Sequence, residues 1–257
     1  MYCQLAFLFW CFFCWGPFLR RLVFTVPLGA QMQDLLHTLH QGVACCAIAG
    51  VVIAHILLID PGCTLDGLDR HLLRAYMHYR AWCRSHGLSG SCVRFNKTRF
   101  NKEKWSMYPE LSTQYKASTV KYMQYWVHAF LMSRRTDNDE DLIYMTYSLA
   151  MFQYMLDTQG PWMSEEKRLE TKGFGCNFLL FYQRLAGSHR GHKRNFKIVP
   201  KFHFFCHMMD YIGQTGRNPR PLRLTEGSVF LRAPNSKIKG FIFNPWSGSK
   251  LCSTYKV

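Results

Sequence analysis

The sequence predicts a mainly α-helical protein, an irregular helical domain with few or no strands and an apolar segment at its N-terminus. Three observations lead to this prediction. Hydrophobic residues make up 48% of the 257 residues, which is enough for a substantial core. Several stretches repeat their apolar residues at the three- and four-residue spacing of a helix. Gly, Pro and charged residues separate these stretches and suit helix ends.

By composition the chain divides into three predicted parts. Residues 1–29 form an apolar leader, residues 30–226 a helical region, and residues 227–257 an irregular tail. The tail is rich in Gly, Ser, Pro and Asn, with a short strand predicted at 241–243. No internal repeat or heptad array is present in the sequence.

Two apolar runs leave two interpretations open. Residues 5–19 are fewer than the ~20 that a spanning helix needs, and Arg20 and Arg21 follow the run, whereas a signal peptide carries its positive charge before it. The second run, 43–59, is broken only by His55. The two runs together predict either a pair of membrane segments or a buried core helix preceded by an apolar leader.

A helix is predicted from a cap at Asp66 or Asp69 to about Ser85, with Gly87 closing it. Its apolar stripe consists of Leu68, Leu72, Ala75, Tyr79 and Trp82. The polar residues 88–109 are interpreted as a basic connector.

Three further helices are expected along the chain. They run from about residue 111 to 132, from the charged break at 134–141 to Gly160, and from about Ser164 to Leu185. The middle helix carries its stripe on Leu142, Met145, Leu149, Phe152 and Leu156. Its acidic start lacks the Gly and the Glu of a calcium-binding loop. Gly173 and Gly175 should weaken the last helix, by about 1 kcal/mol each relative to Ala.

The charge balance indicates a polyanionic partner. Lys and Arg number 32 against 16 Asp and Glu, for a net charge of +16. Such a charge favours nucleic acid or an anionic membrane surface, and a solvated basic surface is the alternative. The segment from residue 184 to 223 contains many Lys and Arg residues and a single acidic residue, Asp210. The predicted phosphate contacts in this segment are Arg190, Lys193, Arg194, Lys197 and Lys201.

Cysteine and histidine give weaker signals. The eleven cysteines are an odd number and scattered, which favours reduced thiols over a disulfide framework. Asp34 and His37 lie one helical turn apart, and His203, Cys206 and His207 share one helical face, so each group could hold a metal or be structural. The motifs GxSxG, GxGxxG, HExxH and the P-loop do not occur, which removes support for serine hydrolysis, nucleotide chemistry and zinc proteolysis.

Several short strings nevertheless follow one another in a recognisable order. They are Asp34-x-x-His37 with Gly42-Val43, Asn101-Lys102, Tyr108-Pro109-Glu110-Leu111, and the segment 198–207 followed by Asn218-Pro219. In this order, over residues 30–226, they resemble uncharacterised proteins of dinoflagellate algae that are themselves similar to degenerate DDE transposases of the CACTA type.

The resemblance implies DNA strand transfer by carboxylates that hold two divalent ions, Mg or Mn. It assigns Asp34 and Glu226 as catalytic acids and Asp34 and His37 as metal ligands, while His203 and His207 are candidate metal ligands by their spacing. Residues 1–30 contain no Asp or Glu, so the first catalytic acid of the family has no counterpart. The resemblance therefore predicts a transposase-derived, catalytically incomplete protein that binds DNA in the nucleus. The alternative is a small integral membrane protein anchored by residues 5–19 and 43–59.

Overall fold

The computed structural model describes residues 35–88, 92–136, 139–189 and 194–220, which all belong to one compact unit that begins at Asp34. The predicted helical class is confirmed, and these residues contain no β-strand beyond a single bridge between Trp162 and Arg217. The helices are η2 (Leu36–Val43), α3 (Ala44–Ile59), α4 (Leu65–Ser85), α5 (Ala117–Met132), α6 (Glu140–Thr158), α7 (Glu165–Ser188) and α8 (Pro200–Thr215). The predicted leader, tail, domain borders and strand at 241–243 lie outside the described residues.

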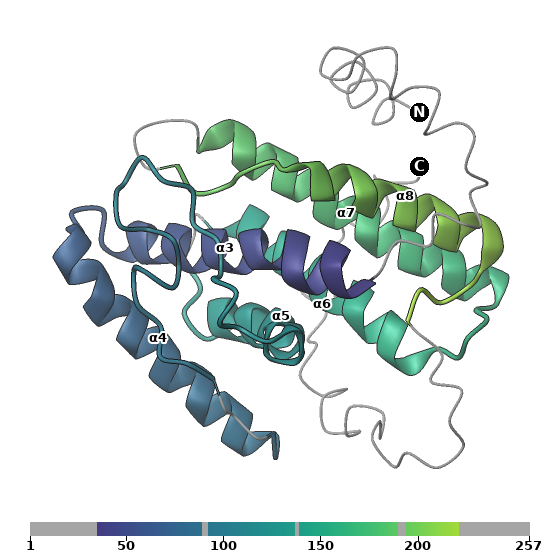
Figure 1. Ribbon diagram of the computed structural model, residues 1–257, viewed down its shortest axis with the longest axis horizontal. Helices are drawn as coiled ribbons and strands as arrows, with labels where there is room; N and C mark the ends of the chain where they lie inside the picture. Colours follow the sequence, from purple (N-terminus) through teal and green to yellow (C-terminus); the bar gives the residue numbers. More distant parts are fainter. Residues whose placement is uncertain (1–34, 89–91, 137–138, 190–193, 221–257) are drawn as a thin grey trace. The chain divides into compact units, whose positions relative to one another are not determined.

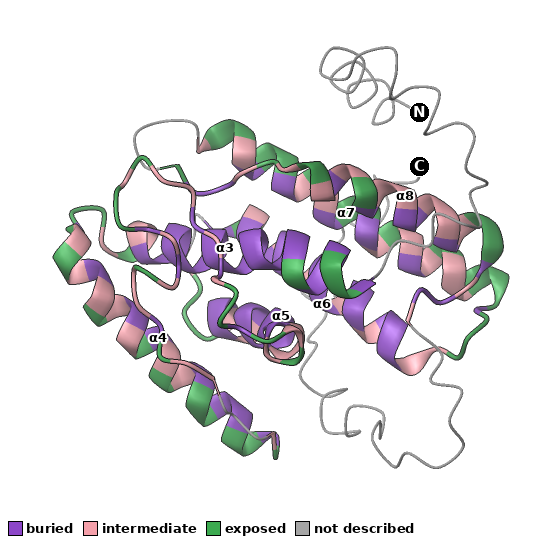
Figure 2. Ribbon diagram, in the orientation of Figure 1, coloured by how far each residue is buried: buried purple, intermediate pink, exposed green. Residues whose placement is uncertain are grey.

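The second apolar run forms the core helix of this unit. Helix η2 leads directly into α3, and the run Leu36–Ile59 is long and apolar enough to cross a membrane. In the fold, however, 83% of its most apolar window is buried inside the protein. Figure 1 shows α3 lying among the other helices, and Figure 2 shows it buried along nearly its whole length. The run therefore has protein partners for its apolar side chains, as a core helix does.

Helix α4 begins earlier than the predicted caps. The cap is Thr64, whose Oγ1 accepts the backbone N–H of Gly67 at 3.1 Å, so the prediction of Asp66 or Asp69 was wrong. Asp69 instead accepts the backbone N–H of Lys97 at 2.7 Å and ties the connector to the helix. The predicted apolar stripe of α4 is buried throughout, and the helix ends at Ser85 as expected.

Helix α5 begins at Ala117, six residues later than the sequence predicts. The intervening backbone is bound by other segments: the N–H of Leu111 donates to the Cys45 carbonyl at 3.3 Å and that of Ser112 to the Arg99 carbonyl at 2.9 Å. These contacts hold the chain before α5, where the N–H of Tyr115 donates to the Ser112 carbonyl at 3.1 Å, only three residues back, as in a turn.

Helices α6, α7 and α8 pack in sequence, α6 against α7 and α7 against α8. The predicted stripe of α6 is buried along its length. Helix α7 passes through Gly173 and Gly175 without interruption, because tertiary packing outweighs a local propensity of this size. At Gly175 a Cβ would collide with the side chain of Met209, so the glycine lets α8 approach closely.

Candidate nucleic-acid interface

Three segments that are far apart in the sequence meet beside the first turns of the core helix. They are η2, the connector around 101–111, and the chain from Arg194 to Lys201 that enters α8. The Leu111 amide binds the Cys45 carbonyl, the Lys201 Nζ donates to the Gln41 carbonyl at 2.7 Å, and Lys197 pairs with Glu110 at 2.8 Å. The short strings within these segments thus form one continuous region, the converging region.

Lys102 holds the converging region together from inside. Its side chain has no exposed surface, and its Nζ donates to the carbonyls of Trp105 at 3.1 Å, Met107 at 2.7 Å and Arg194 at 2.6 Å. Burial lowers the pKa of Lys102 to about 8. All three donor positions of the ammonium are used by backbone, so this lysine fixes the loop and the Arg194 backbone and is closed to an external ligand.

Among the predicted phosphate contacts that the structure describes, Arg194 is the most exposed. The residue is exposed, while its carbonyl is anchored by Lys102. Its guanidinium carbon lies 5.7 Å from the centre of the Tyr108 ring, a cation–π arrangement that limits the motion of the side chain. A guanidinium held in this way loses little conformational freedom when it binds a phosphate.

Lys197 and Lys201 have partners within the protein. The hydrogen bond from Lys197 to Glu110 raises the pKa of the ammonium, and the carboxylate cancels its charge locally. Lys201 donates to a neutral carbonyl and keeps its net charge. Among the predicted phosphate contacts that the structure describes, Arg194 and Lys201 therefore supply more of the positive field than Lys197 does.

The histidine pair of α8 forms as the spacing predicts. The Nε2 atoms of His203 and His207 lie 2.9 Å apart, with one ring donating to the other, and both residues are half-buried. Burial lowers the pKa of His203, and the neighbouring His207 lowers it further. Among the residues that the structure describes, no third His, Cys, Asp or Glu joins the pair at metal-binding distance.

Neither predicted catalytic acid belongs to the described residues. His37 is exposed on η2, while Asp34, Glu226, Arg190 and Lys193 lie outside the described residues. Helix η2 is itself a π-helix, in which the Ala44 N–H donates to the Leu39 carbonyl five residues back. Such helices often occur at functional sites, and no residue-pattern argument predicted one here. Predicted Mg or Mn binding stays a prediction.

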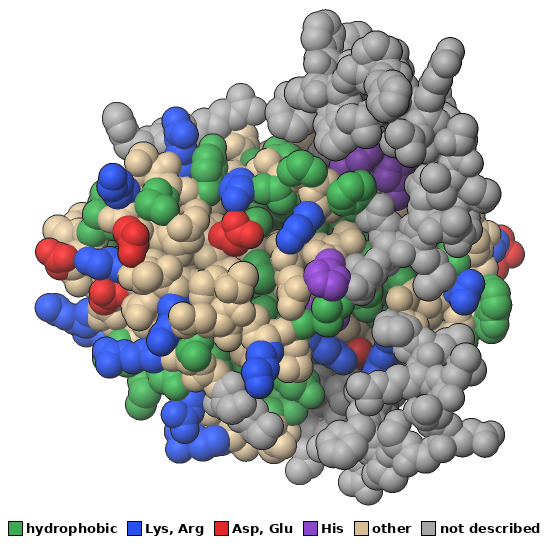
Figure 3. All heavy atoms as spheres, in the orientation of Figure 1, with side chains coloured by type: hydrophobic (Ala, Val, Ile, Leu, Met, Phe, Trp, Pro, Cys, Tyr) green, Lys and Arg blue, Asp and Glu red, His purple; other side chains and the backbone are tan. Residues whose placement is uncertain are grey.

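Asn218, at the end of the resemblance, has a structural role. Its Nδ2 donates to the carbonyls of Leu156 at 2.9 Å and Gln159 at 3.2 Å, and so caps the C-terminal end of α6. Figure 3 shows Lys and Arg side chains spread over one face of the molecule with Asp and Glu among them, without a single dense cluster. The positive charge is therefore a broad field on that face.

Sequence reasoning missed two groups of residues. The sequence shows Tyr108 and Lys102 only as parts of short strings and does not indicate that they position Arg194. Asp60, Cys63 and His71 come together at the turn between α3 and α4, and no common motif has their spacing. No protein-family model, no curated protein and no solved structure matches this chain.

Proposed function

We propose that this protein binds nucleic acid, most simply DNA, through a basic surface that includes Arg194, which stacks on Tyr108, and Lys201 at the start of α8. The observation that carries the proposal is the exposed guanidinium of Arg194, stacked on Tyr108 and anchored through its carbonyl by buried Lys102. Phosphates favour such donors, and the net charge of +16 supplies long-range attraction. Binding of this kind is largely independent of sequence and sensitive to salt.

The transposase relationship belongs to the same proposal. Its support is that the strings around Gly42, Glu110 and Lys201, which are separated in the sequence, meet in the converging region. A Cβ at Gly42 would lie 2.7 Å from Cδ of Lys201, so that glycine permits the contact between two of the strings. We propose a transposase-derived fold that has kept nucleic-acid binding and lost strand transfer.

The test of binding is fluorescence polarisation of a labelled random-sequence DNA duplex across a series of salt concentrations. Each phosphate contact contributes about 0.9 to the slope of log affinity against log salt, so Arg194→Gln should lower the slope by about that amount. Binding that does not respond to salt would contradict the proposal.

Arg217→Gln is the matched control. Arg217 also stacks on an aromatic ring, with its guanidinium carbon 5.9 Å from the centre of Trp162. Trp162 precedes the start of α7 and Arg194 follows its end, so the 24 residues of α7, about 36 Å of helix, separate the two arginines. The Arg217 variant should keep the slope of the parent protein. A slope that changes in this variant and not in Arg194→Gln would move the interface to the opposite end of α7.

Loss of strand transfer is tested by nicking of supercoiled plasmid in Mg or Mn. We expect no metal-dependent nicking by this 257-residue chain, because its residues 1–30 contain no Asp or Glu that could act as the first catalytic acid of the family pattern. Nicking that requires Mn and disappears in Asp34→Asn would show an active nuclease and overturn this part of the proposal.

The membrane alternative is tested separately. Burial of α3 favours a core helix, while residues 5–19 lie outside the described residues. After expression in cells, alkaline carbonate should release the protein from the membrane fraction, as it releases peripheral proteins. Retention in the pellet would favour an integral membrane protein.

A further inference from the structure

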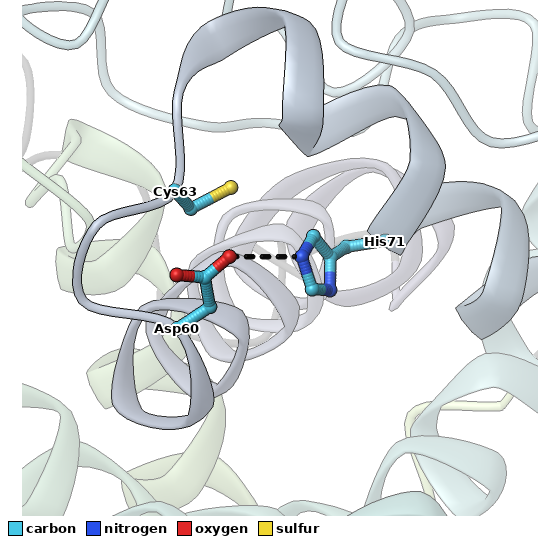
Figure 4. Close-up of side chains that lie close together, drawn as sticks. All are labelled: Asp60, Cys63 and His71. Atoms are coloured by element: carbon cyan, nitrogen blue, oxygen red, sulfur yellow. Dashed lines mark hydrogen bonds and ion pairs between the residues drawn. The ribbon is translucent and has the colours of Figure 1, made fainter.

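We propose that Asp60, Cys63 and His71 form a zinc-binding site at the turn between α3 and α4. One carboxylate oxygen, one sulfur and one imidazole nitrogen lie within 4.8 Å of one another, and the Nε2 of His71 is 3.2 Å from Oδ2 of Asp60. Figure 4 shows the three side chains converging on one space from the turn and from α4. This site is independent of the proposed nucleic-acid binding.

Local structure brings these residues together. Helix α3 ends at Ile59, and the Cys63 N–H donates to the Asp60 carbonyl at 3.1 Å, which closes the turn Asp60-Pro61-Gly62-Cys63. The Thr64 cap then starts α4, and His71 lies on its second turn. The turn and the cap together fix three side chains that a spacing rule would not connect.

The separations suit a small metal ion. With zinc bonds of about 2.0–2.3 Å, the ligand atoms of a tetrahedral site lie roughly 3.3–3.8 Å apart. The contact between Asp60 and His71, at 3.2 Å, is close to the lower end of this range, and a spread of at most 4.8 Å closes with small side-chain rotations. The C-terminal end of α3 also directs its carbonyl dipoles towards the turn, where a cation is favoured.

The donor set selects the class of metal. A thiolate and an imidazole are ligands for zinc and its spectroscopic substitute cobalt, whereas Mg and Ca prefer all-oxygen sites. Binding replaces the Cys63 thiol proton, which is released to solvent, and His71 binds as the neutral imidazole. In this arrangement Nε2 of His71 binds the metal and Nδ1 carries the proton.

The site is open on one side. Among the described residues, no further His, Cys, Asp or Glu reaches the group. The nearby carboxylates are engaged elsewhere, Asp66 with the ammonium and Asp69 with the backbone amide of Lys97. The Asp60 side chain is 45% exposed, so water has access and can fill the fourth position. Three protein ligands and one exchangeable water is the arrangement of zinc sites that keep an open position.

The experiment is titration of the metal-free full-length chain with Co²⁺, followed by displacement with Zn²⁺. We expect a thiolate-to-cobalt charge-transfer band in the near ultraviolet that saturates at one ion per chain. His71→Ala should weaken binding by more than the ~10–100-fold that loss of an outer-sphere partner costs. The His71 side chain is 21% exposed, so this replacement leaves the core in place. Cys63→Ser should remove the charge-transfer band.

Matched variants separate this site from other thiols and histidines of the chain. Cys92→Ser, at a half-buried cysteine after the far end of α4, should keep the band, as should the double variant His203→Ala with His207→Ala. Zinc should also raise the melting temperature of the parent protein and not that of His71→Ala. Absence of a cobalt band in the parent protein would overturn the proposal. So would a band that survives in both His71→Ala and Cys63→Ser, or one that is lost with His203 and His207.

Discussion

Nδ1 of His55 lies 3.7 Å from a carboxylate oxygen of Asp139, and neither side chain has any exposed surface. The pair connects the C-terminal part of the core helix to the residue that precedes α6. The His55 ring also meets Phe130 of α5 edge-on, with centroids 5.3 Å apart. An acid beside an imidazole in a closed core couples the protonation of His55 to folding.

Asp139→Asn should lower the pKa of His55. Burial already lowers that pKa below its ordinary value, Asp139 opposes the shift, and Arg134 adds to it. Asparagine keeps an oxygen for the Thr136 N–H that Asp139 accepts at 3.1 Å, so the local turn should survive. The measurement is an NMR titration of the assigned imidazole. Arg134→Gln supplies the matched change of opposite sign, and an unchanged His55 pKa in both variants would contradict the coupling.

Stability should fall as the pH drops below about 6.5. The pKa values of His55, His78, His189 and His203 are all lowered in the folded state, with burial the largest cause in each. Below the unfolded-state value of 6.5 the unfolded chain therefore binds more protons, and the free energy of unfolding decreases with decreasing pH. Urea denaturation from pH 7 to 5 measures it. The decrease should be steeper in Asp139→Asn, because the His55 pKa lies further from its unfolded value.

Much of the helical framework could be predicted from periodicity, because the apolar stripe of a helix depends on residues that are close together in the sequence. The stripes of α4 and α6 and the stop at Gly160 are of this kind. The start of α5 is different, since the segment before it is held by hydrogen bonds to the distant residues Cys45 and Arg99, which periodicity cannot reveal. Thr64 and Asp66 are both good caps, and the choice between them depends on how the turn after α3 closes.

The candidate sites show the same division. Arg194 could be predicted as a phosphate contact from local charge density. The ring of Tyr108 beneath it and the buried ammonium of Lys102 could not, because these contacts span 86 and 92 positions of sequence and exist only after folding. His71 is likewise brought to Asp60 by the geometry of α3, the turn after it and α4. The sequence spacing between these two residues matches no common metal-binding motif.

Lys102→Met should destabilise the protein strongly. Methionine fills similar space but leaves the carbonyls of Trp105, Met107 and Arg194 without their shared donor, and each unsatisfied buried acceptor costs about 1–3 kcal/mol. We expect a loss of roughly 3–5 kcal/mol in urea denaturation. Lys104→Met, at an exposed position in the same loop, should change stability by less than about 0.5 kcal/mol. Equal effects of the two variants would refute the structural role of Lys102.

Because of Lys102, the free energy of unfolding should rise between pH 8 and 10.5. Its pKa is about 8 in the folded protein against 10.5 as a free side chain, so between these values the unfolded chain binds more protons. The contribution of this group to the free energy of unfolding therefore increases as the pH rises from 8 to 10.5. Comparison of the parent protein with Lys102→Met over this range isolates that contribution, and parallel pH profiles would count against it.

Gly50→Ala and Gly173→Ala should have opposite effects. A Cβ on Gly50 would lie 2.6 Å from the Asn195 carbonyl oxygen and 2.9 Å from the Phe196 ring, so α3 and the chain before α8 would be forced apart. The expected loss is about 1–3 kcal/mol. A Cβ on Gly173 would have no described atom within 4 Å apart from its own helix backbone and chain neighbours. Alanine at this position should therefore stabilise α7 by about 0.5–1 kcal/mol. Thermal or urea denaturation measures both, and stabilisation by Gly50→Ala would mean that the close approach is absent.

Cys45 and Cys46 should resist alkylation until the protein unfolds. Both lie in the first turn of α3, and burial raises the pKa of each thiol to about 12. At pH 8 a reagent that needs the thiolate would therefore find about one molecule in ten thousand ionised at each site, apart from the steric barrier. Cys176 is exposed on α7 and should react within the same sample at an ordinary rate. The labelled peptides are quantified by mass spectrometry over time and over a urea series. If α3 is the core helix, labelling of Cys45 and Cys46 should follow the global unfolding transition, because their exposure requires loss of the contacts that bury the helix. Labelling of these two cysteines at low urea, with the rest of the fold intact, would show that α3 leaves the core independently.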